Sequence, residues 1–324
     1  MLKTLFGWFD GRAETAPDTD DKQTTADHWS ENLAGSDAFS ADVYWLAVPA
    51  VQRRHRQKSV AGTPHPGWVQ YCLGEFLRKE KAGVCMLSIG CGTGTLEREL
   101  HGLGAFEQCD AVDIAPAAIE VARAEALKAG ATNIDYRLLD IERTDLPHQH
   151  YDAVWFNGSL HHIKELESVC KRVRQSLKPG GWLFFNEYVG ANHFAFGEQQ
   201  RAAISHAFEL IPESMRRSFV QGSFGQVQKV VPLPNPADVV KVDPSEAVRS
   251  ADILRVVGEH FDIRALNRCG GTLLQFLMHG IAGNFREDDP QSQRILQMLF
   301  DIEDGLVESG TLDSDFVIVA ATTG

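Results

Sequence analysis

The sequence has little positive charge and no long hydrophobic run. Its 324 residues include 31 lysine and arginine residues against 44 aspartate and glutamate residues, which gives a formal net charge of -13. Because binding to a nucleic-acid backbone needs a positive surface field, we expect no nucleic-acid partner. No apolar stretch approaches the roughly 20 residues that cross a bilayer, so we also expect no stable membrane insertion.

Paired cysteine motifs are missing as well. The six cysteines are scattered along the chain without a C-x-x-C pair, so the sequence predicts neither a disulfide framework nor a metal site. The first residues, "MLKTLFGWFDGR", lack the length and the flanks of a secretory signal. Reduced thiols and the lack of a signal pattern favour a cytoplasmic protein.

Two segments precede the predicted sheet. Residues 1–28 become rich in small and charged residues after the first few positions, a composition that favours a disordered or weakly ordered segment. Residues 29–82 show apolar residues at helical spacing, interrupted at "AGTPHPG". We therefore expect a helical lead-in or cap over this second range.

Residues 83–190 alternate short apolar runs with helical stretches, which is typical of a parallel sheet covered by helices. The predicted strands are "VCMLSIG", "CDAVDIA", "IDYRLLD", "YDAVWFNGS" and "WLFFNEYV", the last after a turn at "KPGG". Residues 191–258 break this alternation with a helical stretch and a proline-rich linker, so we expect an insertion or lid. Residues 259–324 add two strands, "FDIRALNRC" and "SDFVIVAAT", around a helical pair. The predicted fold class is α/β, with a doubly wound, mostly parallel seven-stranded sheet.

A glycine-rich turn follows the first predicted strand. Gly90, Gly92 and Gly94 leave backbone N–H groups uncovered, so that a ligand can approach the main chain. The spacing is G-x-G-x-G, and Thr95 stands where a dinucleotide fingerprint places its third glycine, which disfavours NAD. Asp113 ends the second predicted strand and can accept ribose hydroxyls. Asp140 ends the third and lies at the same crevice, so the sequence predicts a nucleoside pocket.

Several motifs together resemble the class I S-adenosylmethionine-dependent methyltransferases. They are "LSIGCGTG", "VDIA", "LLDIE", "YDAVWFNGSLHHI" and "LKPGGWLFFNEYV". The resemblance implies S-adenosylmethionine as cofactor and a Rossmann-like sheet whose last strand is antiparallel. It places the methionine end over the glycine turn, the ribose on Asp113, the adenine beside two isoleucines, and the adenine amine on Asp140. The implied cofactor-binding residues are Ser88, Gly90, Cys91, Gly92, Gly94, Asp113, Ile114, Asp140, Ile141 and Asn157, and Ser88 replaces the usual acidic residue.

Methyl transfer from a sulfonium is an in-line displacement, so the protein mainly positions the acceptor and excludes water. A hydroxyl acceptor is helped by a nearby base, and His161, His162 and Glu187 are the candidates because they follow the fourth strand or end the fifth. Tyr188 is the next residue and is expected to contact the substrate. Arg53, within the basic run "QRRHRQK", is expected to bind an anionic part of it.

The acceptor is predicted less directly. The residues after the fourth strand read "NGSL" and lack the proline-rich motif of amino-methylating DNA enzymes. A weaker resemblance connects the chain to uncharacterised bacterial methyltransferases of saccharides and other small molecules. It lies in "VYWLAVPAVQRRH", "NEYVG", "DPSEAVRSADIL" and "GGTLLQFLMHGIAGNF". We therefore expect a small-molecule or glycan acceptor. A protein methyltransferase and a non-catalytic ligand-binding or interaction module remain alternatives, and the sequence also allows a homodimer.

Overall fold

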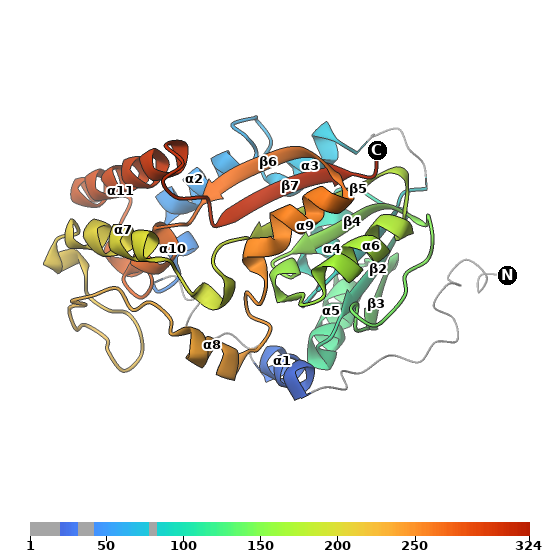
Figure 1. The fold of residues 1–324 in the computed structure, drawn as a ribbon, viewed down its shortest axis with the longest axis horizontal. Coiled ribbons are helices and arrows are strands. Elements are labelled where there is room, and N and C mark those ends of the chain that lie inside the picture. Colours follow the sequence, from blue (N-terminus) through green and yellow to red (C-terminus); the bar gives the residue numbers. More distant parts are fainter. Residues whose placement is uncertain (1–19, 32–41, 78–82) are drawn as a thin grey trace.

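The computed structural model describes residues 20–31, 42–77 and 83–324. Seven strands form one sheet in the order β3-β2-β1-β4-β5-β7-β6 (Figure 1). Strands β1 to β5 pair in parallel, and β7 pairs antiparallel with both β5 and β6. The predicted fold class is therefore confirmed. The strands are β1 (Cys85–Ile89), β2 (Gln108–Asp113), β3 (Ile134–Leu138), β4 (Tyr151–Asn157), β5 (Leu177–Tyr188), β6 (Asp262–Gly270) and β7 (Phe316–Thr322).

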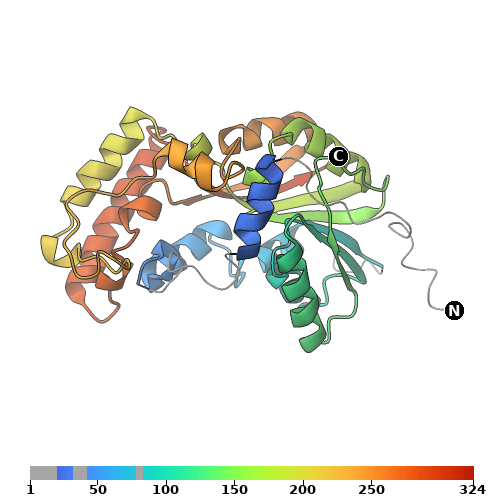
Figure 2. The same cartoon turned by 90° about the horizontal axis from the view of Figure 1, so that it is seen from below.

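Helices cover both faces of the sheet (Figure 2). Helices α6 (Leu166–Ser176) and α9 (Ile253–His260) pack their buried leucine, isoleucine and valine residues on one face. On the other face lie α3 (Trp68–Glu75), α4 (Thr95–Gly102) and α5 (Pro116–Lys128). Side chains alternate between the two faces of each strand, so the apolar runs supply both layers of core.

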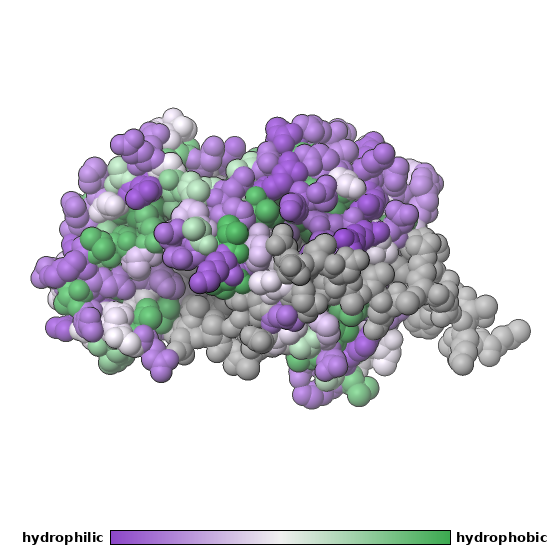
Figure 3. Space-filling model, turned by 60° about the horizontal axis from the view of Figure 1, so that its bottom comes forward, coloured by the Kyte–Doolittle hydropathy of each residue, from purple (hydrophilic) through white to green (hydrophobic). Residues whose placement is uncertain are grey.

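A second hydrophobic core lies beside the sheet, in a lobe that we call the helical lobe. It consists of α2 (Pro49–Ser59), α7 (Glu198–Glu209), α10 (Leu274–Leu277) and α11 (Pro290–Glu308). These helices come from the predicted lead-in, insertion and C-terminal segments, which therefore share one core. On the face in Figure 3, hydrophobic residues are more frequent over this lobe than over the sheet domain.

Three segments differ from the sequence prediction. Residues 20–28, predicted as part of a disordered tether, lie in helix α1 (Asp20–Glu31), while residues 1–19 lie outside the described residues. Strand β5 includes the predicted "KPGG" turn, because Leu177 already pairs with Tyr151. The predicted linker contains helix α8 (Pro236–Val242), which begins where the Asn235 side chain accepts the N–H of Ala237 at 2.9 Å.

Candidate functional site

A cavity of about 370 Å³ opens at the carboxyl ends of β1, β2, β3 and β4. This is the edge of a doubly wound sheet at which ligands bind, beside the point where the strand order reverses between β1 and β4. The structure brings nine of the ten predicted cofactor-binding residues into its lining: Ser88, Gly90, Cys91, Gly92, Asp113, Ile114, Asp140, Ile141 and Asn157. The predicted catalytic residue His162 also lines this cavity.

The glycine turn needs glycine for different reasons at its different positions. All three residues have positive φ, with 69° at Gly90, 51° at Gly92 and 79° at Gly94. A Cβ on Gly90 would lie 2.3 Å from the Cβ of Ser159, whereas a Cβ on Gly92 would meet no protein atom within 4 Å. Gly94 does not line the cavity, because it is the N-cap of α4 and faces Tyr136. The space in front of Gly92 is therefore available to a ligand.

Asp113 fixes the shape of the turn. The N–H of Gly92 donates to its Oδ2 and the N–H of Ala115 donates to its Oδ1, each at 2.8 Å. Burial raises the pKa of this carboxyl, and the backbone hydrogen bonds oppose that shift. Asp113 thus connects β2 to the glycine turn of β1 as well as lining the cavity.

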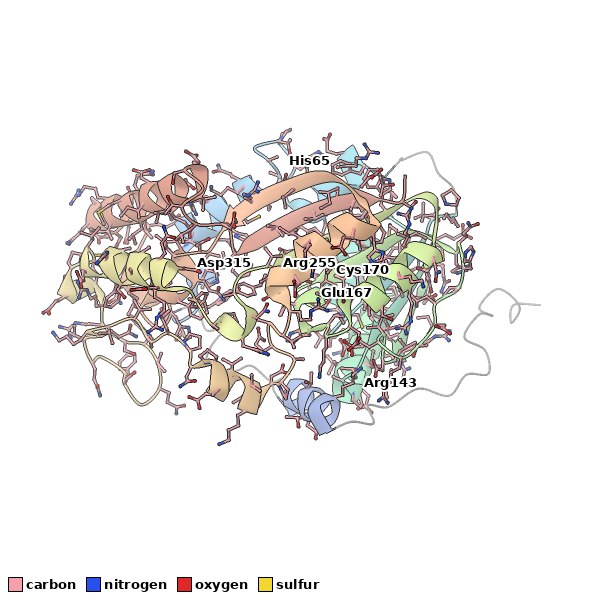
Figure 4. The ribbon with its side chains drawn as sticks, viewed as in Figure 1. His65, Arg143, Glu167, Cys170, Arg255 and Asp315 are labelled. Atoms are coloured by element: carbon pink, nitrogen blue, oxygen red, sulfur yellow. The ribbon has the colours of Figure 1, made fainter. Side chains whose placement is uncertain are left out.

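Helix α1 lies against the far end of the cavity, at Asp140. The Lys22 Nζ is 2.7 Å from both carboxylate oxygens of Asp140 and 2.7 Å from Oε2 of Glu142. Thr25, one turn further along α1, also lines the cavity and donates to Oδ1 of Asp243 at 2.9 Å. Arg143, labelled in Figure 4, is also near Asp140, with 3.7 Å between its Nε and Oδ2 of Asp140. The N-terminal segment therefore contributes to the site, which its composition did not indicate.

Glu97 is another lining residue that the sequence did not predict. Its side chain is fully buried and comes from the first turn of α4. The Ser88 hydroxyl donates to its Oε1, and in the described part of the chain its buried Oε2 has no hydrogen-bond partner. Burial raises the pKa of Glu97 to about 7, although the Ser88 hydrogen bond opposes the shift. The signal available in the sequence was the helical position of Glu97, facing the strand end where Ser88 lacks a charge.

The histidine pair lies on a 3₁₀ turn, Leu160–His162, directly after β4. His161 Nδ1 is 2.6 Å from Oε2 of Glu187, while the N–H groups of Ser159 and Leu160 donate to Oε1 of Glu187 at 2.7 Å each. Glu187 is buried and is not part of the cavity lining. Its carboxylate holds the turn and His161 in place.

The two histidines have different surroundings. Burial lowers the pKa of His161, but the negative charges of Glu187 and Glu246 outweigh it and raise this pKa to about 9. His162 Nδ1 is 2.8 Å from the hydroxyl of Ser245, another lining residue. Ligand atoms of His161, His162 and Glu246 lie within 4.8 Å of one another, close enough for one metal ion. The expectation of no metal therefore stays a prediction.

The two predicted substrate-binding residues lie outside the cavity. Tyr188 is buried, its hydroxyl donates to the carbonyl of Ala191 at 3.1 Å, and its ring packs against Phe316. Arg53 lies on α2, forms an exposed ion pair with Glu287, and lines a separate open hollow next to β6. Their assignment as substrate-binding residues stays a prediction.

The fold and the site together define a class of protein. A sheet in the order 3-2-1-4-5-7-6 with antiparallel β7, and a glycine turn after β1, is the arrangement of class I S-adenosylmethionine-dependent methyltransferases. Residues 87–185 match the family model described as a methyltransferase domain. The chain therefore carries a methyltransferase domain over residues 87–185, on a sheet of this type.

Known relatives match part of the chain. The chain is 34% identical to the ubiquinone biosynthesis O-methyltransferase of Bordetella bronchiseptica over 122 residues. This alignment covers 37% of the chain and 47% of the relative. The chain is 37% identical over 112 residues to the protein of that name from Xanthomonas axonopodis pv. citri, covering 34% of this chain and 45% of the relative. The chain thus spans about half the length of the curated relatives it matches.

A solved structure matches over a longer range. The geranyl diphosphate C-methyltransferase of Streptomyces coelicolor superposes with a TM-score of 0.50 at 13% identity, covering 96% of this chain and 100% of that one. This likeness concerns the fold alone. Within the described residues, no helix combines the length and the apolar character that a membrane span requires.

Proposed function

We propose that the protein transfers a methyl group from S-adenosylmethionine to a small-molecule or saccharide-type acceptor. The observation that carries this proposal is the cavity in which the glycine turn, Asp113 and Asp140 meet at neighbouring strand ends. An oxidoreductase with the same type of sheet would bind NAD, which the G-x-G-x-G spacing disfavours.

The cavity lining suits the parts of this cosubstrate. Gly92 leaves open space beside its main chain, and the buried Glu97 Oε2 is an unsatisfied acceptor suited to a ligand's donor. Asp113 has carboxylate oxygens with remaining acceptor capacity for ribose hydroxyls. Ile114 and Ile141 supply apolar walls near Asp140, as an adenine ring requires.

When bound, the sulfonium of S-adenosylmethionine supplies an electrophilic methyl group, and its thioether leaves without protonation. The tasks left to the protein are to orient the acceptor, exclude water and receive a proton where the acceptor carries one. We assign the last task to His162, because it lines the cavity and its Nδ1 lies 2.8 Å from the hydroxyl of Ser245. Thr25 and Ser245 help to cover the cavity from outside the sheet.

The class of acceptor depends on the size and position of the space that the bound cosubstrate leaves free in the cavity. The turn after β4 contacts the segment near Ser245 through the His162–Ser245 hydrogen bond, and both line the cavity, which favours a small acceptor over a folded protein. The specific suggestion of a saccharide rests on the sequence resemblance at residues 43–55, 186–190, 243–254 and 270–285.

Two measurements, made one after the other, test this function. Calorimetric titration should give binding of S-adenosylmethionine and S-adenosylhomocysteine and none of NAD. An acceptor screen with methyl-labelled S-adenosylmethionine should then label a sugar nucleotide or another small metabolite. Label transferred only to protein would instead support a protein methyltransferase, and ligand binding without any transfer would support a non-catalytic module.

A further inference from the structure

The end of β1 carries a hydroxyl where the resemblance leads one to expect a carboxylate. Ser88 is almost fully buried and lines the cavity, yet it has no charge to place against a ligand's ammonium group. A carboxyl group is nevertheless present at this point. It comes from the next element of the chain, because the Ser88 hydroxyl donates to Oε1 of Glu97 on α4.

The carboxylate of Glu97 is in an unusual state for a buried acid. Its side chain is 0% exposed, and its Oε2 has no hydrogen-bond partner among the described residues although the side chain lines the cavity. Leaving a buried carboxylate oxygen unsatisfied costs free energy, so such a group in a folded protein calls for a ligand or a proton.

We infer that Glu97 is the residue that receives the ammonium group of the cosubstrate's methionine end, with Ser88 holding its carboxylate in position. This inference rests on the proposed function. Ser88 and Glu97 together then replace a single acidic residue on the strand. Ser88 on β1 orients the carboxylate by a hydrogen bond, and Glu97 on α4 carries the charge. The unsatisfied Oε2 is the acceptor left for the ligand.

The groups around Glu97 make its charge depend on the ligand. Arg98 on the same helix favours the charged form, while Asp113 on β2 disfavours it, and burial is the largest influence. Cys91, Cys109 and Tyr136 also face Glu97, and burial raises the pKa of each well above its ordinary value. Burial also raises the pKa of Asp113 above its ordinary value.

A pH dependence of binding follows from this arrangement. With a pKa of about 7 in the free protein, Glu97 is largely protonated at pH 6. An ammonium ligand favours the charged form of Glu97, so ligand binding below pH 7 releases a proton from this carboxyl. The affinity therefore weakens by up to about tenfold for each unit by which the pH falls below 7. Measurements stay below about pH 7.5, because above it an α-amino group begins to lose its own proton.

The experiment compares two ligands on matched variants by calorimetry. S-adenosylhomocysteine carries the ammonium group, whereas 5′-methylthioadenosine lacks the amino-acid end. We expect Glu97→Gln to weaken S-adenosylhomocysteine about 10- to 100-fold and to change methylthioadenosine less than about twofold. The variant should also lose the steep pH dependence between pH 5.5 and 7. The double variant Ser88→Asp with Glu97→Gln should recover part of the lost affinity, since it returns the charge to the strand.

The outcomes separate the inference from the proposed function. A wild-type protein that binds neither ligand would overturn the function itself. Wild-type binding that Glu97→Gln leaves unchanged, in affinity and in pH profile, would overturn the inference and leave the function standing. Equal loss of both ligands in Glu97→Gln would also overturn it, because Glu97 would then support the fold of the turn and not the ammonium group.

Discussion

At the scale of single residues, the glycine turn combines two requirements that a substitution can separate. Gly92 has a positive φ and faces open space, and so does Gly130 at the end of α5, which is not in the cavity lining. Replacing either by valine forces a branched residue into the left-handed region at a cost of about 1 to 2 kcal/mol. Only at Gly92 would the new side chain also enter the ligand space.

We therefore expect Gly92→Val to abolish detectable binding of S-adenosylhomocysteine, while Gly130→Val binds normally and loses a similar amount of thermal stability. Calorimetry and thermal unfolding of the two variants check this. If folded Gly92→Val bound like the wild type, the glycine turn would have a purely structural role.

Replacing Asp113 is expected to weaken ligand binding and to disturb the conformation of the glycine turn. Its carboxylate accepts the N–H groups of Gly92 and Ala115, so Asp113→Ala removes two charge-assisted hydrogen bonds in addition to the predicted ribose contact. We expect cosubstrate binding to weaken by about 2 to 3 kcal/mol. Asp145→Ala, at a residue whose side chain is 84% exposed, is the control and should bind unchanged. An unaltered dissociation constant in Asp113→Ala would remove the ribose assignment.

His161 predicts how stability changes with pH. Its pKa is raised from 6.5 to about 9 by Glu187 and Glu246, against the effect of burial. A raised folded-state pKa means that the stabilisation is fully present below pH 6.5 and is lost as the pH rises through 9. We expect up to about 3 kcal/mol of the unfolding free energy to disappear over this range. Urea unfolding from pH 6.5 to 9.5 should show this loss in the wild type and a flatter profile in His161→Gln; parallel profiles would contradict it.

The residue scale also shows why part of the site could be predicted and part could not. Gly90, Asp113 and Asn157 are set by local chain position, because each stands at a strand end and the strands follow from apolar runs. Lys22 meets Asp140 across 118 positions, and Ser88 meets Glu97 only once α4 turns back over β1. Such contacts depend on packing that no local pattern records.

At the scale of elements, α1 shows the same limit. Its composition resembles that of an unfolded tether, yet it rests against α5 and places Lys22 and Thr25 at the cavity. Tertiary contacts thus stabilise a helix that propensity alone would not support. The five predicted strands of the core, in contrast, are all present, and burial on both faces gives β1 and β4 nearly continuous apolar runs.

This placement predicts a covering role for α1. Removing residues 1–31 deletes the ion pairs of Lys22 with Asp140 and Glu142 and the bond from Thr25 to Asp243. We expect S-adenosylhomocysteine to dissociate about tenfold faster from the truncated chain, since an open cavity admits water and releases ligand more easily. Stopped-flow displacement measures this rate, and circular dichroism verifies that the sheet domain remains folded. An unchanged dissociation rate would show that α1 does not close the site.

At the scale of the whole molecule, a partly buried hydrogen bond joins the sheet domain to the helical lobe. Asp315, labelled in Figure 4 at the start of β7, accepts a hydrogen bond from Gln200 of α7 at 2.8 Å. Burial raises the pKa of Asp315 to about 7. Helix α7 is thus fixed to the sheet, whereas the chain between α7 and α9 carries exposed apolar residues such as Phe224 and Val230. The possible homodimer stays a prediction.

The segment from residue 194 to residue 250 therefore joins a fixed helix to a part that borders the cavity at Ser245. Methyl transfer benefits when water is excluded around the sulfonium, and movement of this segment over the acceptor would achieve that. We expect amide exchange in residues 220–250 to slow when S-adenosylhomocysteine and the acceptor from the screen are both present, and to slow less with S-adenosylhomocysteine alone. Helix α11, in the core of the same lobe, is the internal control and should exchange at a constant rate. Exchange in this segment that ignores both ligands would show that it does not gate the site, and the acceptor would then be sought near the basic residues of α2, where Arg53 and Lys58 line a separate hollow.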